Sequence, residues 1–313
     1  MEKIVLKNIK EGDKPIGFLL VTKLEEKLTK NGSAYVVFTL TDGEKEIEAN
    51  LWNHSITDVT VTPESVASFE INCKIYQEKL SYEICRYMQD DSPVDITDFI
   101  KKAPMDSQKM FNEILMICDS AGAEGELPRL VHRIYEAEKD KLLYWGAAKA
   151  VHHNYYGGLL YHTLRMVRQA YVLVSVYPEL DREVLFCAAA LHDIGKLREL
   201  ETSALGTSEY TTLGNLSSHL AIGSGMISEY RDCKTYPEPT EKFLLLKHCI
   251  ESHHGKLEWG AISVPKTKEA YALFLIDMMD SRMEQFINIE NSLEPGSFSP
   301  RIFGLETKVY RPN

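Results

Sequence analysis

The chain has 313 residues, of which 44% are hydrophobic and 26% are charged, and its formal net charge is -11. This length exceeds that of a typical single domain, so we expect two domains. The composition is typical of a folded globular protein and excludes a largely disordered one. The negative net charge argues against a protein that coats nucleic acid through general basicity, because such binding depends on neutralising phosphates.

No apolar run approaches the roughly 20 residues of a membrane-spanning helix. The first ten residues mix charges into their apolar positions, unlike a signal peptide. We therefore expect a cytoplasmic protein with no membrane partner. The six cysteines form no CxxC pair, which indicates neither a zinc ribbon nor a redox dithiol, and most should be reduced and buried.

Five short segments in the first ninety or so residues are rich in β-branched residues or alternate between apolar and polar residues. They lie at 18–24, 34–40, 46–52, 69–76 and 80–87. Turn-forming residues separate them, and the stretch around Pro63 leaves room for a small helix before the fourth strand. This pattern predicts a small Greek-key barrel of the OB type, whose second and third strands commonly bind oligonucleotides.

Alternation within the second and third strands predicts which side chains face outward. Val36, Phe38 and Leu40 should face inward, which places Tyr35 on the outside. The same reasoning places Trp52 on the outside of the third strand. Aromatic rings at these positions can stack on bases, so both rings are candidate substrate-binding residues. Packing against the other domain is the alternative.

The segment 93–106 is predicted to be a linker, because Pro93 and Pro104 disfavour helix at the residues before them. Beyond it the apolar period changes from two to 3.6. Helices are expected at 110–117, 128–135, 159–171, 182–192, 217–227, 242–250 and 269–280. The predicted fold class is multi-domain α+β, with an OB-type barrel over 1–92 and an all-helical domain over 107–313. The chain after Asn291 should be an extended tail on the surface.

Histidine and aspartate residues recur along the helical segment at positions that could converge in the fold. They are His162, His192, Asp193, His219, His253, His254 and Asp277. Neutral imidazole nitrogens and ionised carboxylate oxygens together suit a divalent metal. Asp277 lies in a strongly apolar helix, where an ionised carboxylate is costly unless it is paired or bound to metal.

We expect two ions that share Asp193. One oxygen of Asp193 would bind the first ion together with His162, His192 and Asp277. The other oxygen would bind the second ion together with His219, His253 and His254. Two cations roughly 3.5 to 4 Å apart can activate water and hold both reacting oxygens of a phosphodiester, which implies hydrolytic phosphoryl transfer. Such an imidazole-rich site suits Mn, Fe, Co or Ni better than Mg.

The order His162, His192-Asp193, Asp277 resembles the H…HD…D signature of the HD-domain phosphohydrolases, and LeuHisAspIleGlyLys (191–196) is close to its usual core. The further histidines resemble the two-metal branch. The segments 152–163, 192–200 and 251–260 and the tail 296–305, behind an OB-like module, resemble the YhaM family of 3'→5' exoribonucleases. This resemblance covers essentially the whole chain.

The resemblance implies manganese-stimulated, stepwise removal of 5'-mononucleotides from the 3' end of single-stranded RNA, with single-stranded DNA as a second candidate substrate. Two alternatives stay open. One is a hydrolase of small nucleotides, and the other is a nucleic-acid-binding protein whose HD domain is not catalytic. The sequence also leaves open whether the chain forms a homo-oligomer.

Three further residues are candidates for contacts with substrate. Lys196 lies one helical turn from Asp193 and would contact a phosphate oxygen as charge develops, which makes these two the expected catalytic residues; a surface lysine is the alternative. Arg165 is a candidate phosphate contact, with an ion pair inside its helix as the alternative. His153, next to His152, could line the substrate entrance or cap its loop.

Two residues near the expected ligands are given other roles. Asp280 lies one turn after Asp277 and is expected to orient a ligand histidine. His248 lies about 140° round a helix from His253 and should point away from the metals. HD phosphodiesterases that open cyclic dinucleotides resemble this chain less, because their GlyTyrPro element after the paired histidines is absent here, and Gly158 stands where some have a carboxylate.

Overall fold

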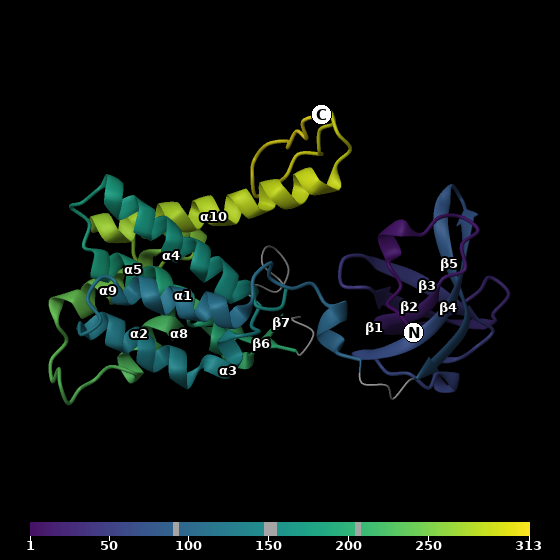
Figure 1. The fold of residues 1–313 in the computed structure, drawn as a ribbon, viewed down its shortest axis with the longest axis horizontal. Helices are drawn as coiled ribbons and strands as arrows, with labels where there is room; N and C mark the ends of the chain where they lie inside the picture. Colours follow the sequence, from purple (N-terminus) through teal and green to yellow (C-terminus); the bar gives the residue numbers. More distant parts are fainter. Residues whose placement is uncertain (90–93, 147–154, 204–207) are drawn as a thin grey trace. The chain divides into compact units, whose positions relative to one another are not determined.

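The computed structural model describes residues 1–89, 94–146, 155–203 and 208–313 (Figure 1). The chain divides into two compact units, Met1–Lys102 and Ala103–Asn313, each with its own hydrophobic core. The division falls inside the segment 93–106 that the sequence predicts as a linker. Among the helices of the described residues, none is both long and apolar enough to cross a membrane.

The first unit is a closed barrel with the strand order β1-β2-β3-β5-β4. Its strands are β1 (Ile16–Leu28), β2 (Ala34–Thr41), β3 (Glu46–Trp52), β4 (Ser65–Tyr76) and β5 (Lys79–Gln89). All neighbouring strands are antiparallel except β3 and β5, which are parallel. This barrel confirms the predicted OB-type fold.

Alternation places the side chains of β2 and β3 as expected. Val36, Phe38 and Leu40 are fully buried inside the barrel. Tyr35 and Trp52 lie directly opposite each other in the β2–β3 register, with ring centroids 4.6 Å apart. Trp52 is 40% exposed and Tyr35 is partly buried, so the two rings form one aromatic surface on the outside of the barrel.

Short 3₁₀ helices complete the first unit. Leu6–Asn8 forms η1 before the first strand. The segment between β3 and β4, where the sequence leaves room for a small helix, contains the 3₁₀ turn Ile56–Asp58 (η2). Ile96–Phe99 forms η3, which contacts β1 and buries Phe99. Part of the predicted linker is therefore folded onto the barrel.

The second unit is predominantly helical. Its helices are α1 (Ser107–Asp119), α2 (Glu126–Ala137), α3 (Lys139–Leu142), α4 (Gly158–Val176), α5 (Arg182–Leu191), α6 (Lys196–Glu199), α7 (Thr212–Leu216), α8 (His219–Glu229), α9 (Glu241–Ser252), η4 (Leu257–Trp259) and α10 (Lys268–Ser292). All seven predicted helices are present. The expectation of an all-helical domain needs one correction, because Leu200–Thr202 (β6) and Ser208–Tyr210 (β7) pair as a short antiparallel hairpin.

Helix α5 is the centre of the second unit. Every residue from Val184 to Leu191 is buried, and α1, α2, α4, α9 and α10 all contact this helix. The small side chains of Ala188, Ala189 and Ala190 allow the neighbouring helices to approach closely. Since interiors are close-packed, the residues that follow α5 are held in a fixed position.

The tail follows α10 and folds back on itself rather than running extended across the surface (Figure 1). Two isolated β-bridges, Phe298↔Tyr310 and Ile302↔Thr307, join its two halves. Leu305 and Val309 are buried. We call the segment 297–311 the tail hairpin.

We expect Tyr135→Phe to lower the free energy of unfolding by about 1 kcal/mol, because the fully buried Tyr135 hydroxyl donates a 2.9 Å hydrogen bond to the carbonyl oxygen of Ala190 in α5. Urea denaturation measures this change. Tyr177→Phe removes a hydroxyl from an exposed ring and is the matched control, with an expected change near zero. Equal effects of the two substitutions would contradict the assigned hydrogen bond.

Candidate metal centre

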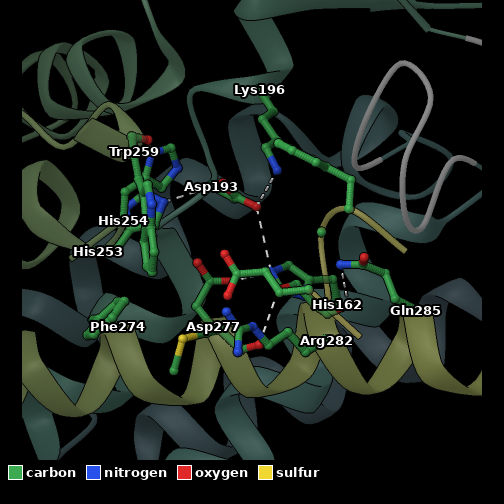
Figure 2. Close-up of a pocket in the computed structure, with 15 residues that line it drawn as sticks. His162, Asp193, Lys196, His253, His254, Trp259, Phe274, Asp277, Arg282 and Gln285 are labelled. Carbon is green, nitrogen blue, oxygen red and sulfur yellow. Dashed lines mark hydrogen bonds and ion pairs between the residues drawn. The ribbon is translucent and has the colours of Figure 1, made fainter. Parts of the chain in front are cut away.

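The seven side chains predicted as metal ligands lie together in the second unit. Figure 2 labels His162, Asp193, His253, His254 and Asp277. They come from five helices. His162 lies in the first turns of α4, and His192 and Asp193 follow α5 directly. His219 begins α8, while His253 and His254 follow α9. Asp277 lies in the middle of α10.

Asp193 stands between two groups of histidines. Its Oδ2 atom is 3.4 Å from Nε2 of His192 and 3.7 Å from Nε2 of His162. Its Oδ1 atom is 3.3 Å from Nε2 of His219 and 3.8 Å from Nε2 of His253. Each carboxylate oxygen therefore faces a different pair of imidazoles, as expected for a carboxylate shared by two ions.

Two sets of three side chains have ligand atoms within 4.8 Å of one another. The first set is His162, His192 and Asp277, and the second set is His219, His253 and His254. These are the sets that the sequence assigns to the two ions on either side of Asp193. The structure thus brings the predicted ligands into the predicted grouping.

All five imidazoles are anchored through Nδ1. The acceptor is a carbonyl oxygen for three of them: Ala189 for His192 at 2.9 Å, Ile250 for His253 at 2.7 Å, and Trp259 for His254 at 2.9 Å. It is a carboxylate for two: Asp280 for His162 at 2.8 Å, and Glu199 for His219 at 3.1 Å. Donation from Nδ1–H leaves the lone pair on Nε2, which is the arrangement of a histidine that binds a metal.

Local helix geometry explains two of these anchors. The last carbonyl groups of a helix have no partner within the helix. His192 and His253 each directly follow a helix. Nδ1–H of each ring donates a hydrogen bond to the carbonyl oxygen three residues earlier, which gives that carbonyl a partner. The same contact ends the helix and turns Nε2 toward the cluster.

The chemistry of the donor set fits a divalent metal. Nε2 of His219 is buried and has no hydrogen-bond partner within the described part of the chain. Nε2 of His162 lies 3.1 Å from Nε2 of His192, so two basic nitrogens face each other at close range. One cation at each of the two ligand sets would satisfy these lone pairs, and imidazole with carboxylate suits a transition metal.

The electrostatic field of the cluster favours positive charge. Burial lowers the pKa of His162, but the carboxylates of Asp277 and Asp280 outweigh burial and raise it to about 10, so a metal ion would bind Nε2 of this ring in place of a proton. Burial would raise the pKa of Asp193, yet Lys196 and His192 hold it well below its usual value. Asp193 therefore stays ionised although only 4% of it is exposed.

Burial keeps His253 and His254 neutral. Burial lowers the pKa of His253 well below its usual value, and the neighbouring His192 adds to this effect. Burial also lowers the pKa of His254, with a further contribution from His219. Because only a neutral imidazole binds a metal, both rings are ready to act as ligands.

A cavity of about 530 Å³ opens onto the cluster. Figure 2 shows Asp277, Arg282 and Gln285 rising from α10 into it. Trp259 and Phe274 line the same cavity. The volume lies within the range of small-molecule sites.

The other predicted site residues have distinct surroundings. Lys196 lines the cavity, and its Nζ atom lies 2.7 Å from Oδ2 of Asp193. The Arg165 guanidinium pairs with Asp280 at 2.6 Å and with Glu284 at 2.8 Å, both on α10 rather than on its own helix. His153 lies outside the described residues.

Asp280 makes the contact with His162 that was expected of it. Nε2 of His248 accepts a hydrogen bond from the backbone of Lys266, and His248 belongs to neither ligand set. Sequence reasoning missed Glu199, which accepts hydrogen bonds from both the backbone and the ring of His219. Glu199 is buried, but a lone glutamate in a short polar segment gives no signal of burial.

Comparison with known proteins agrees with this geometry. The HD domain family matches residues 159–282, a range that contains all seven predicted ligands. A protein named 3'-5' exoribonuclease YhaM from Oceanobacillus iheyensis is 33% identical over 310 residues, which cover 96% of this chain and 95% of that protein. The chain belongs to the YhaM family.

Two further YhaM proteins match over nearly the full length. The protein named 3'-5' exoribonuclease YhaM from a Geobacillus species is 32% identical, over 94% of this chain and 91% of its own length. The protein of that name from Bacillus subtilis is 29% identical, over 96% of each chain. The similarity to YhaM proteins therefore spans both the barrel and the helical unit.

We expect Gly195→Ala to reduce the metal content of the protein. A Cβ atom on Gly195 would overlap the carbonyl oxygen of His219, so α8 would have to move away from the turn that holds Asp193. Metal bound per chain after dialysis against Mn(II) measures the effect, and we expect a loss of half or more.

Gly225→Ala is the matched control, because Gly225 lies on α8 and a Cβ atom there meets nothing within 4 Å. This substitution should leave metal content unchanged and add up to about 1 kcal/mol of stability through helix propensity. Wild-type metal content in Gly195→Ala would show that the close contact does not position His219.

Proposed function

We propose that this chain is a metal-dependent 3'→5' exoribonuclease that releases 5'-mononucleotides from single-stranded RNA, and that accepts single-stranded DNA as a second substrate. The observation that carries the proposal is the two-sided Asp193 carboxylate, whose oxygens lie within 3.8 Å of Nε2 of His162, His192, His219 and His253. The names of three full-length YhaM relatives support the reaction and its polarity. Its free cysteines fit the reducing cytoplasm.

The proposed cofactor is a pair of divalent ions, with manganese favoured over iron, cobalt or nickel. His162, His192, Asp277 and one oxygen of Asp193 would hold the first ion. His219, His253, His254 and the other oxygen of Asp193 would hold the second. Bound cations of this kind supply an activated water and neutralise charge on the phosphodiester.

Lys196 is the proposed catalytic residue that binds no metal. Burial lowers its pKa, but Asp193 outweighs burial and raises it, so the amine stays charged. The ion pair with Asp193 holds Nζ on the cavity wall. There the ammonium can donate a hydrogen bond to a phosphate oxygen, and this bond strengthens as negative charge develops.

Arg165 holds the site indirectly in this proposal. Its ion pair with Asp280 orients a carboxylate that in turn fixes the ring of His162. A phosphate would have to displace two carboxylates from the guanidinium, so positioning is the role that its contacts support better. His153 remains a candidate for the substrate entrance.

The aromatic surface of Tyr35 and Trp52 on the barrel is the proposed platform for upstream RNA. Base stacking on aromatic rings tolerates any sequence, because every base has a π-face. The barrel would then hold a strand without the general basicity that this acidic chain lacks.

We expect Asp193→Ala to abolish turnover of a 5'-labelled RNA while leaving RNA binding largely intact. Wild-type protein with Mn(II) should give a descending ladder of products, since nucleotides leave from the 3' end. Gel analysis and a binding assay on the same oligomer measure the two properties.

Asp119→Ala is the control carboxylate, because Asp119 pairs with His132 away from the cluster; it should cleave normally. Retained activity in Asp193→Ala would remove this carboxylate from the mechanism. Cleavage of free nucleotides without any ladder would favour a small-nucleotide hydrolase instead. Metal content and RNA binding without any hydrolysis would indicate a non-catalytic HD domain.

We expect the double change Tyr35→Ala and Trp52→Ala to raise KM at least tenfold for a long RNA and much less for a dinucleotide. Only the long substrate has upstream bases that could stack on the barrel. Tyr76→Ala is the control, because Tyr76 is an exposed ring of the same barrel at the β4–β5 turn. Equal effects on the long and short substrates would count against stacking on the barrel.

A further inference from the structure

The tail hairpin presents one aromatic ring to the metal cavity. Phe303 is 97% exposed and, with Gly304 and Glu306, lines the cavity that contains His162, Asp193 and Asp277. A fully exposed phenylalanine gains nothing for folding, since its apolar area stays in water. Stability of the fold therefore does not explain the position of this ring.

The exposure of Phe303 contrasts with its neighbours. Leu305 and Val309 are buried, and the Phe298 ring packs on Tyr310 with centroids 4.7 Å apart. Other apolar side chains of the hairpin are therefore buried or in contact with a neighbouring ring, and Phe303 is neither. Poor packing of the whole tail does not explain the free ring.

Backbone contacts hold the turn that carries Phe303. The amide of Ile302 donates to Thr307 at 2.8 Å, and the amide of Glu306 donates to Phe303 at 3.2 Å. Glu306 has a φ of 57°, which closes a tight turn in the left-handed region. The ring is thus displayed on an ordered turn.

Gly304 brings this turn against α10. A Cβ atom at Gly304 would lie 2.8 Å from Oε1 of Gln285, so only glycine allows the approach without a shift of that side chain. Gln285 lies eight residues after Asp277, which corresponds to about 12 Å along a helix. Phe303 is therefore held at the Gln285 end of the cavity that Asp277 also lines.

Trp259, which also lines the cavity, already packs against other side chains of the protein. Nζ of Lys256 lies 4.4 Å from the centroid of the Trp259 ring, and Phe274 packs against the same ring at 6.1 Å. Trp259 thus has partners on the protein, whereas Phe303 forms no ring contact within the described chain. Positive charge is also available in the cavity, because Lys196 and Arg282 line it.

We propose that Phe303 stacks on the base of the 3'-terminal nucleotide, the one that is released, and that the tail hairpin forms the end wall of its subsite. The inference rests on the proposed exonuclease activity. Such an enzyme accommodates a single nucleotide beyond the bond that it cleaves, and the turn at Gly304 closes that side of the cavity. Stacking on a phenylalanine tolerates every base, which stepwise removal of a mixed sequence requires.

The test compares wild-type protein and Phe303→Ala on 5'-labelled RNA oligomers with Mn(II). One oligomer is intact, one lacks the base of its 3'-terminal nucleotide, and one lacks the base of the nucleotide before it. We expect Phe303→Ala to lower kcat/KM about tenfold on intact RNA. Loss of the terminal base should lower the wild-type value by a similar factor and should cause little further loss in Phe303→Ala.

Three controls accompany the comparison. Phe303→Trp should retain activity, because it keeps a stacking surface. Tyr177→Ala removes another exposed ring of the same unit that does not line the cavity, and it should behave as wild type. Thermal stability and metal content of Phe303→Ala should be unchanged, since the ring contributes no buried area.

Several outcomes would overturn the inference. Unchanged kcat/KM in Phe303→Ala would exclude the contact, and independent losses from the protein and substrate changes would exclude stacking between them. If the effect of Phe303→Ala depended on the penultimate base, Phe303 would contact the penultimate nucleotide and not the 3'-terminal one. Absence of any ladder with wild-type protein would instead refute the exonuclease activity itself, and this result is seen before the variants are compared.

Discussion

The carboxylate of Asp193 is the constraint on which the rest of the site depends. It directly follows α5, a helix that is buried along its length, and so it enters the interior of the second unit as an ionised group. A buried charge is tolerated only when it is paired or bound to metal. Lys196 neutralises it at Oδ2, and imidazoles from four helices approach both oxygens. Asp193 can therefore stay ionised only because these helices converge, and the helices carry side chains that converge on its charge.

The precision of the cluster comes from the atoms behind the histidines. His192 and His253 use carbonyl groups at the ends of their own helices, so the local chain fixes their rings. His162 and His219 depend on carboxylates from distant segments, Asp280 and Glu199. The Arg165 ion pair with Asp280 extends this support and ties α4 to α10. Rings held through Nδ1 keep Nε2 in place even when no ligand pulls on it.

Local patterns predicted much of the structure. The alternation of Val36, Phe38 and Leu40 was enough to place the barrel core. The free-energy cost of an ionised carboxylate in an apolar helix was enough to identify Asp277 as a candidate metal ligand. Local sequence patterns did not predict features that depend on tertiary contacts. The three-residue strands β6 and β7 are too short to show a period, and the burial of Glu199 depends on α8 lying against it. The tail was expected to be extended because Pro295, Gly296 and Pro300 disfavour helix, but Leu305 and Val309 bury enough apolar surface to fold it.

The charge of the chain constrains how a polyanionic substrate can be held. With a net charge of -11, long-range attraction cannot collect RNA, so binding has to be local. Cations between the two histidine groups, with Lys196, would supply positive charge only where a phosphate reacts. Aromatic rings would supply the rest, at Tyr35 and Trp52 on the barrel and at Phe303 beside the cavity. Stacking releases no counterions, so this division makes affinity depend on bases more than on salt. An acidic exonuclease that bound RNA in this way would gain discrimination for single strands, because only unpaired bases expose the faces that such rings contact.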